Sequence, residues 1–176
     1  TIQRLGDVGI NGRVKEVRDH QKQKNIYLEL RGPLFDGNPK NISVITVNIS
    51  LKERPLYPPE QRMIFSQYLD IPSFDVFVMP STELLSEKIR ALLTRNKARD
   101  VYDVWFLLNK NTRFSPSDVN KKLKKHKLSF NAKYLTAKVD EKEKSWRSDL
   151  ESLILGTLPE FKKVRKTIVE KITRKP

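Results

Sequence analysis

A chain of 176 residues, 38% hydrophobic and 32% charged, can bury a core as one domain or two small ones, and no apolar run approaches the roughly 20 residues that span a bilayer. The lack of cysteine excludes disulfides and thiolate metal sites, and two histidines, His20 and His126, are too few for a typical structural zinc site. The net charge of +14 favours polyanionic partners such as nucleotide or nucleic acid, although a thermophile-like, Lys-rich chain with ion-pair networks has the same composition.

The amino-terminal stretch TIQRLGDVGING contains neither a charged leader nor a continuous apolar segment. No secretory signal is therefore expected, and a cytoplasmic location is predicted. Alternating apolar and polar residues then predict two strands, Val14 to Arg18 and Ile26 to Leu30, joined as a hairpin by a long loop.

Residues 42–51, ISVITVNISL, are the clearest strand, because Ile45, Val47 and Ile49 share one apolar face while the other face is mixed. The prolines of RPLYPPEQ, residues 54–61, exclude regular structure there. Two further strand candidates follow, RMIFSQYL at 62–69 and SFDVFVMP at 73–80.

The pattern changes to helix after Pro80. Ser81 is a plausible N-cap for a helix that extends to about Arg95, and a second helix is predicted over residues 98–108. Ser115 and Pro116 begin a third. Residues 138–172 predict two more helices, separated around residues 156–159.

These elements predict an α+β protein. An amino-terminal antiparallel or mixed β-sheet portion is expected over residues 1–80, followed by a carboxy-terminal helical domain, a bundle, over residues 81–176.

A run of lysines follows the start of the third predicted helix. Such a run is most often a solvated helix face, and the alternative is a ridge that contacts nucleic-acid phosphates. Its members are Lys121, Lys122, Lys124, Lys125 and Lys127.

Residues 88–108, KIRALLTRNKARDVYDVWFLL, place a knot of charge between two helical runs. On one helix Lys88, Arg95 and Arg99 would share a face, where three cations need a negative partner. If the helix ends near Asn96, acidic residues of the next helix lie close to that face. The spacing then indicates an ion pair that locks the helix corner. The candidate pairs join Arg95 or Arg99 to Asp100 or Asp103.

Residues 81–108, STELLSEKIRALLTRNKARDVYDVWFLL, resemble the signature of the AbiEii/AbiGii toxin-type nucleotidyltransferases. That signature has a Glu-rich helix start, a lysine after a second Glu, an arginine further on, and RDxxD with an aromatic-aliphatic tail. The flanks LRGPLFDGNPKNISVITVNISLKERP and SWRSDLESLILGTLPEFKKV also resemble family segments, so the likeness covers roughly residues 25–170.

The resemblance implies a polymerase-beta-like nucleotidyltransferase toxin, encoded beside an antitoxin, that transfers a nucleotide from an NTP to tRNA or another RNA with Mg²⁺. Lys88 matches the family lysine expected to contact the NTP phosphates, Arg95 is a further nucleotide-binding candidate, and Asp100 matches an active-site acid. The remaining matches, at supporting or structural positions, are Glu83, Glu87, Arg99 and Asp103.

The chain departs from the family at the metal site. The family's Gly-Ser or Gly-Gly-Thr turn and its Asp-x-Asp pair are absent, and the strand position that resembles a third family acid is Asn48, whose amide is a poor Mg²⁺ ligand. The chain is therefore expected to be inactive alone, as the carboxy-terminal portion of a longer protein or as a protein that has lost the chemistry. No cofactor is expected to be needed for folding.

Two other functions remain open. One is a basic, non-enzymatic module that binds nucleic acid through the lysine run. The other is an interaction portion that docks on an antitoxin, on a separate amino-terminal half, or on a second copy as a homodimer that covers unpaired strand edges.

Overall fold

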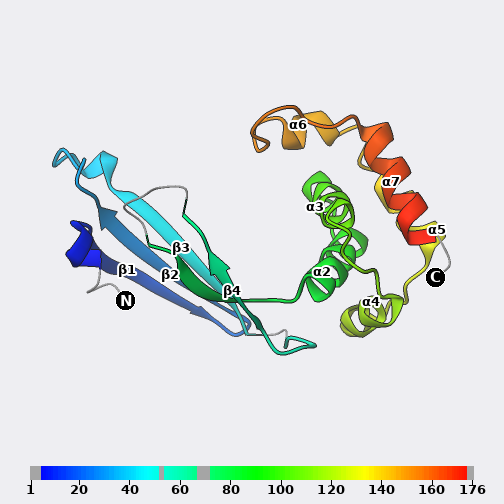
Figure 1. Ribbon diagram of the computed structural model, residues 1–176, viewed down its shortest axis with the longest axis horizontal. Coiled ribbons are helices and arrows are strands. Elements are labelled where there is room, and N and C mark those ends of the chain that lie inside the picture. The colour runs from blue at the N-terminus through cyan, green and yellow to red at the C-terminus, as the bar shows by residue number, and fades with distance from the viewer. Residues whose placement is uncertain (1–4, 52–53, 67–71, 174–176) are drawn as a thin grey trace. The chain divides into compact units, whose positions relative to one another are not determined.

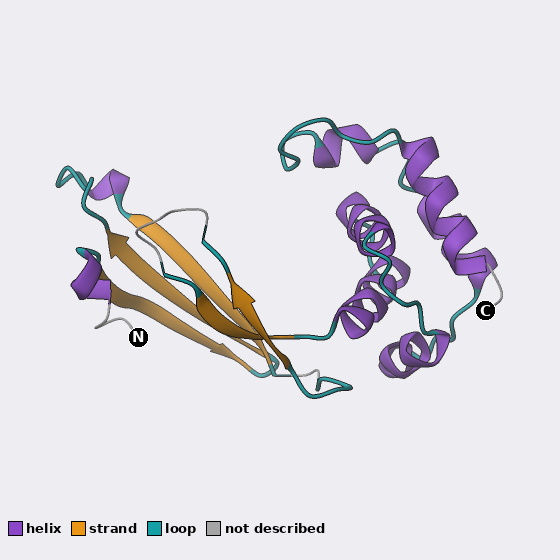
Figure 2. Cartoon of the chain, viewed as in Figure 1, coloured by secondary structure: helices purple, strands orange, loops and turns teal. Residues whose placement is uncertain are grey.

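Strands precede the α-helices along the chain in the computed structural model, which describes residues 5–51, 54–66 and 72–173 (Figure 2). The sheets are antiparallel, and the predicted α+β class is confirmed. The chain forms two compact units, Thr1–Arg54 and Pro55–Pro176, and the second contains strands as well as the helices. The strands give way to helices after Pro80, the boundary predicted from the sequence, whereas the division of the chain into two compact units falls between Arg54 and Pro55.

The first unit is a three-stranded antiparallel sheet in which β1 (Asn11–His20), β2 (Gln23–Arg31) and β3 (Ser43–Ser50) lie side by side in that order (Figure 1). Short 3₁₀ helices, η1 (Gly6–Val8) and η2 (Pro39–Asn41), flank the strands. The predicted hairpin of β1 and β2 is present, but the prediction of a long loop between them is wrong. The polar residues on both sides of the turn continue the strand pairing as far as His20 and Gln23. Asp19 pairs with Lys24 there, and their side chains form an ion pair of 2.9 Å.

The two faces of this sheet differ in polarity. The register places Val14 opposite Leu28 and Leu28 opposite Ile45, so these apolar side chains share one face. On the other face Glu29 is buried, and its carboxylate accepts from Arg13 at 2.8 Å and pairs with Lys15 at 3.0 Å. Hydrogen bonds from Arg13 and Lys15 hold the pKa of Glu29 below its ordinary value.

The second unit begins with the antiparallel pair β4 (Glu60–Ile64) and β5 (Phe74–Val78). The predicted strand at residues 62–69 thus begins two residues earlier in the structure, and its residues 67–69 lie outside the described residues. The helices that follow are α2 (Ser81–Thr94), α3 (Ala98–Asn109), α4 (Pro116–Leu123), α5 (Ala132–Asp140), α6 (Trp146–Leu150) and α7 (Phe161–Thr173), with the 3₁₀ helix η3 (Lys124–His126) after α4.

Local signals explain most of these helix ends. The Ser115 side chain accepts from the Asp118 backbone N–H at 3.3 Å, and Pro116 is the first helical residue, as predicted. Ser81 is not the N-cap: Pro80 occupies that position without a side-chain bond, and Ser81 is already helical. Only Leu135 and Val139 are buried in α5, so its apolar stripe was too thin to predict.

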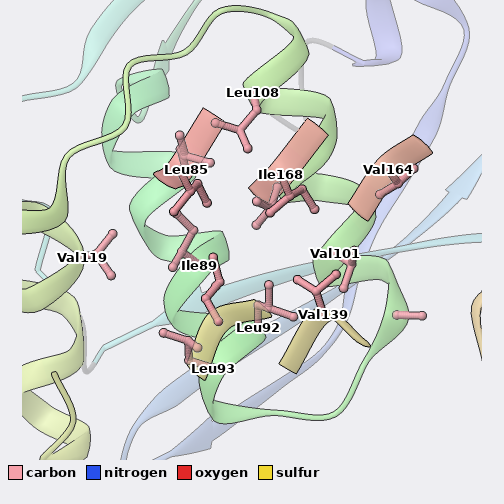
Figure 3. Packing of buried hydrophobic residues seen from close by; sticks show 14 of the residues in the cluster. Leu85, Ile89, Leu92, Leu93, Val101, Leu108, Val119, Val139, Val164 and Ile168 are labelled. Atoms are coloured by element: carbon pink, nitrogen blue, oxygen red, sulfur yellow. The ribbon is translucent and has the colours of Figure 1, made fainter. Parts of the chain in front are cut away.

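The core of the second unit is built from the apolar stripes of the helices. Figure 3 shows Leu85 and Ile89 of α2, Val101 of α3 and Ile168 of α7 gathered within one cluster. Trp146 of α6 closes it and donates its indole N–H to the Pro159 carbonyl at 2.9 Å. The α2–α3 hairpin, which carries the charged signature, is thus anchored along its length.

Candidate functional site

The site centres on the corner between α2 and α3. The backbone is extended at Arg95 and Lys97, which flank the helices, and the Arg95 N–H donates to the Ala91 carbonyl at 2.9 Å. The Asp100 N–H donates to the Lys97 carbonyl at 3.1 Å and closes the first turn of α3. This tight turn brings the end of α2 beside the start of α3.

A bidentate ion pair locks this corner. Arg95 donates from Nε to Asp100 Oδ2 at 2.7 Å and from Nη2 to Asp100 Oδ1 at 2.6 Å. The Asp100 side chain is 0% exposed and that of Arg95 is 45% exposed. Hydrogen bonding to Asp100 raises the pKa of Arg95 above its ordinary value. Of the pairings that the spacing allows, the structure contains Arg95 with Asp100.

A second ion pair joins the same two helices. Lys88 Nζ lies 2.7 Å from Asp103 Oδ2, and the two side chains are 30% and 34% exposed. Lys88 lies on α2 and Arg95, seven residues later, is the C-cap of that helix, so the two are about 10 Å apart along the helix axis. We call these two pairs the ion-pair ladder: one rung is Lys88–Asp103, which water reaches, and the other is Arg95–Asp100, whose acid is sealed.

Arg99 does not join the ladder. It is exposed and makes no ion pair with any residue that the structure describes. Together with Lys97 and Asp149 it lines a separate cavity of about 230 Å³.

Glu83, at the start of the signature, binds the irregular segment around Leu56 and Tyr57 to α2. Its fully buried carboxylate accepts from the N–H groups of Leu56 at 2.8 Å and Tyr57 at 3.1 Å, and from Lys122 Nζ at 2.6 Å. Burial would raise the pKa of Glu83, but these three donors hold it below its ordinary value. Glu87 forms an ion pair with Arg90. Both acids of the helix start thus have structural contacts.

The lysine run divides into buried and exposed members. Lys122 has only 7% of its side chain exposed, and its ammonium binds Glu83 at 2.6 Å and lies 3.8 Å from Glu87. Lys121 binds Asp118 at 2.9 Å, and Asp118 also accepts from the Tyr57 hydroxyl at 2.8 Å. The Asp118 contacts were not predicted, because 61 residues separate it from Tyr57.

Three lysines, Lys124, Lys125 and Lys127, are exposed on and just after η3. A cavity of about 680 Å³ beside them is lined by Lys121, Lys124 and Phe130. Of the lysines predicted to form a phosphate-contacting ridge, all are therefore exposed except Lys122.

The donor set does not fit a magnesium ion. Among residues 5–51, 54–66 and 72–173, no three acidic or histidine side chains gather as a metal site would require. Glu83, Asp100 and Asp103 are each bound to a cation. Asn48 lies opposite Asn25 in the first unit, so this cross-strand pair contributes two amides and no carboxylate.

The comparisons with known proteins agree with the signature. A family model described as the nucleotidyl transferase AbiEii toxin of a type IV TA system matches residues 3–169. No curated protein and no solved structure gives a match. Within the described part of the chain, no helix has the length and apolarity needed to cross a membrane.

Proposed function

The chain belongs to the AbiEii family of nucleotidyl transferase toxins, and on this premise we propose that it binds the phosphates of an NTP at the ion-pair ladder, with RNA as the acceptor. Lys88 is the residue that would contact the phosphates. The observation that carries this proposal is the openness of its ion pair with Asp103, in which both side chains are about one-third exposed. An exposed ammonium is a compact point charge that can exchange a carboxylate for a phosphate oxygen.

Arg95 supports the same role from the other rung. A guanidinium has five N–H donors, and Asp100 uses two of those on Arg95. The remaining donors make no hydrogen bond with the described residues, and nearly half of the side chain is exposed. Arg95 can therefore bind a phosphate while it remains attached to Asp100.

Asp100 is best explained as a positioning residue. Its carboxylate has no exposed surface and both oxygens bind Arg95, so it would act on a ligand through that guanidinium. The prediction that Asp100 is itself catalytic stays a prediction. Arg95 would have to leave Asp100 before the carboxylate could contact a substrate.

Because the described donors do not fit Mg²⁺, we further propose that this chain binds nucleotide but does not complete the transfer alone. The missing carboxylates would come from a separate amino-terminal half. As a member of a toxin family of type IV TA systems, the chain would also have an antitoxin partner. Within the described residues both β1 and β3 have only one neighbour in their three-stranded sheet, so either strand has an edge at which such a partner could pair.

A second candidate function is a non-enzymatic RNA-binding module. The exposed Lys124, Lys125 and Lys127 and the adjacent cavity favour it, because lysines near an aromatic ring suit single-stranded RNA. The same surface would hold the acceptor RNA if the chain takes part in transfer.

Nucleotide binding and transfer are tested separately. Titration of a fluorescent NTP analogue should show binding that Lys88→Ala weakens and that Lys162→Ala, a change of an exposed lysine on α7, leaves unchanged. Equal affinity of the Lys88→Ala variant and the original chain would remove Lys88 from the role. Labelled NTP, Mg²⁺ and tRNA should give no transfer with this chain alone, and transfer would refute the proposed inactivity.

A further inference from the structure

A cavity of about 380 Å³ lies between the α2–α3 corner and the end of α5. Arg95 and Asn96 line it from the corner, and Lys138 and Lys142 line it from the other side. Its volume is within the range of pockets that bind small molecules. Apart from Arg95, none of these residues is among the candidate site residues predicted from the sequence.

Lys142 is the most unusual of them, because its side chain is only 1% exposed. Its ammonium donates to Asn96 Oδ1 and to Glu141 Oε2, the latter at 3.2 Å. A lysine ammonium has three donors, so one makes no hydrogen bond with the described residues. A buried donor of this kind is expected to have a partner.

The charges around the cavity do not balance. Glu141 also accepts two hydrogen bonds from Lys138, both at 2.9 Å, so two ammonium groups share one carboxylate. Asp100 offers no compensation, since both of its oxygens bind Arg95. The cavity walls therefore carry one positive charge in excess. Of the groups that share this excess only Lys142 is buried, so its ammonium is poorly hydrated, and a bound anion would stabilise it.

We propose that this cavity is a phosphate-binding site, in which Lys142, Lys138 and Arg95 contact the phosphate of a nucleotide or free phosphate. Tyr134, 41% exposed and also lining the cavity, would lie against the rest of a larger ligand. The site does not depend on Lys88, which lies seven residues before Arg95 on α2.

The test is calorimetric titration of the whole chain with inorganic phosphate, pyrophosphate and ATP, without divalent metal. Lys138→Met and Lys142→Met should each weaken phosphate binding at least tenfold, or about 1.4 kcal/mol. Lys133→Met changes an exposed lysine on the same helix that does not line the cavity, and it should bind as the original chain does. In the Lys88→Ala variant, which lacks the proposed NTP contact of the ladder, tighter binding of ATP than of phosphate would identify a nucleotide as the ligand of the cavity, and equal binding would identify free phosphate.

Three results would overturn the proposal: no binding of any of the three anions, unchanged binding in both variants, or an equal loss in Lys133→Met. Lys138 is partly exposed, so Lys138→Met decides the matter if Lys142→Met does not fold. Lys88→Ala separates this site from the proposed function. It should weaken ATP binding and leave inorganic phosphate binding intact, whereas Lys138→Met should weaken both.

Discussion

The two rungs of the ion-pair ladder should differ in energy, although both join an acid of α3 to a cation of α2 or its C-cap. Arg95→Ala leaves the Asp100 carboxylate fully buried without its cation. Removal of one partner from a buried pair costs about 3–5 kcal/mol. Because Arg95 is itself 45% exposed, water can reach part of the vacated space, and we expect a value near the lower end, about 3 kcal/mol. Lys88→Ala breaks a pair that is already hydrated and should cost about 0.2–1 kcal/mol.

Tryptophan fluorescence during thermal unfolding is the appropriate assay. The two tryptophans, Trp105 and Trp146, both belong to the helical core, so the signal reports the second unit and not the first. At about 4 °C per kcal/mol for a unit of roughly 120 residues, Arg95→Ala should lower the Tm by about 12 °C and Lys88→Ala by at most about 4 °C.

Arg99→Ala is the matched control for the loss of an arginine. Its side chain is exposed and unpaired among the described residues, so the change should stay within about 0.5 kcal/mol. If Arg95→Ala and Lys88→Ala destabilised the chain equally, the distinction between a sealed and an open rung would be refuted.

Three other outcomes are expected. Glu83→Gln should lower the stability at neutral pH and make the loss of stability in acid less steep. Because the pKa of Glu83 is depressed, its contribution is present above the ordinary value of 4.5 and is lost as the pH falls through the folded-state value. Urea midpoints at several pH values would measure both effects. Tyr57→Phe should lower the Tm more than Tyr134→Phe, because only the Tyr57 hydroxyl has a hydrogen-bond partner among the described residues, on α4; equal Tm values would contradict this. Replacement of Lys124 and Lys127 by Gln should reduce the slope of log affinity for single-stranded RNA against log salt by about 1.4, and an unchanged slope in filter binding would exclude them as phosphate contacts.

The sequence predicted the helices that carry the signature because their apolar stripes are strongly periodic. The end of α2 and the start of α3 agree within one residue with the prediction. The hairpin of β1 and β2 was less predictable, since polar residues in a strand exposed to water resemble a loop. Asp19 and His20 continue the pairing of β1 with β2 through the backbone, and this pairing depends on register rather than on hydrophobic pattern.

The candidate site was predictable only in part. The sequence identified Arg95 and Asp100, but the choice of partner depends on the extended backbone at the helix corner, which spacing does not specify. Lys142 could not be found in this way. It lies 46 residues from Asn96 within a Glu- and Lys-rich segment that has the composition of a surface, and only tertiary packing buries it.

In the described residues the acids of the signature are already paired with cations, which disfavours metal binding, whereas some of those cations are partly exposed, which favours phosphate binding. The acids of the signature are each bound to a cation, and on the first sheet the row that contains Asn48 continues through Asn25 to Arg18. An acid at the position of Asn48 would therefore face an amide and an arginine, whereas a metal pair for nucleotidyl transfer needs several carboxylate oxygens together. In the proposed function phosphate binding needs only accessible cations, and Lys88 and Arg95, which are 30% and 45% exposed, would supply them. Under the proposed function, nucleotidyl transfer would thus require carboxylates from outside the described residues, while recognition of the nucleotide would not.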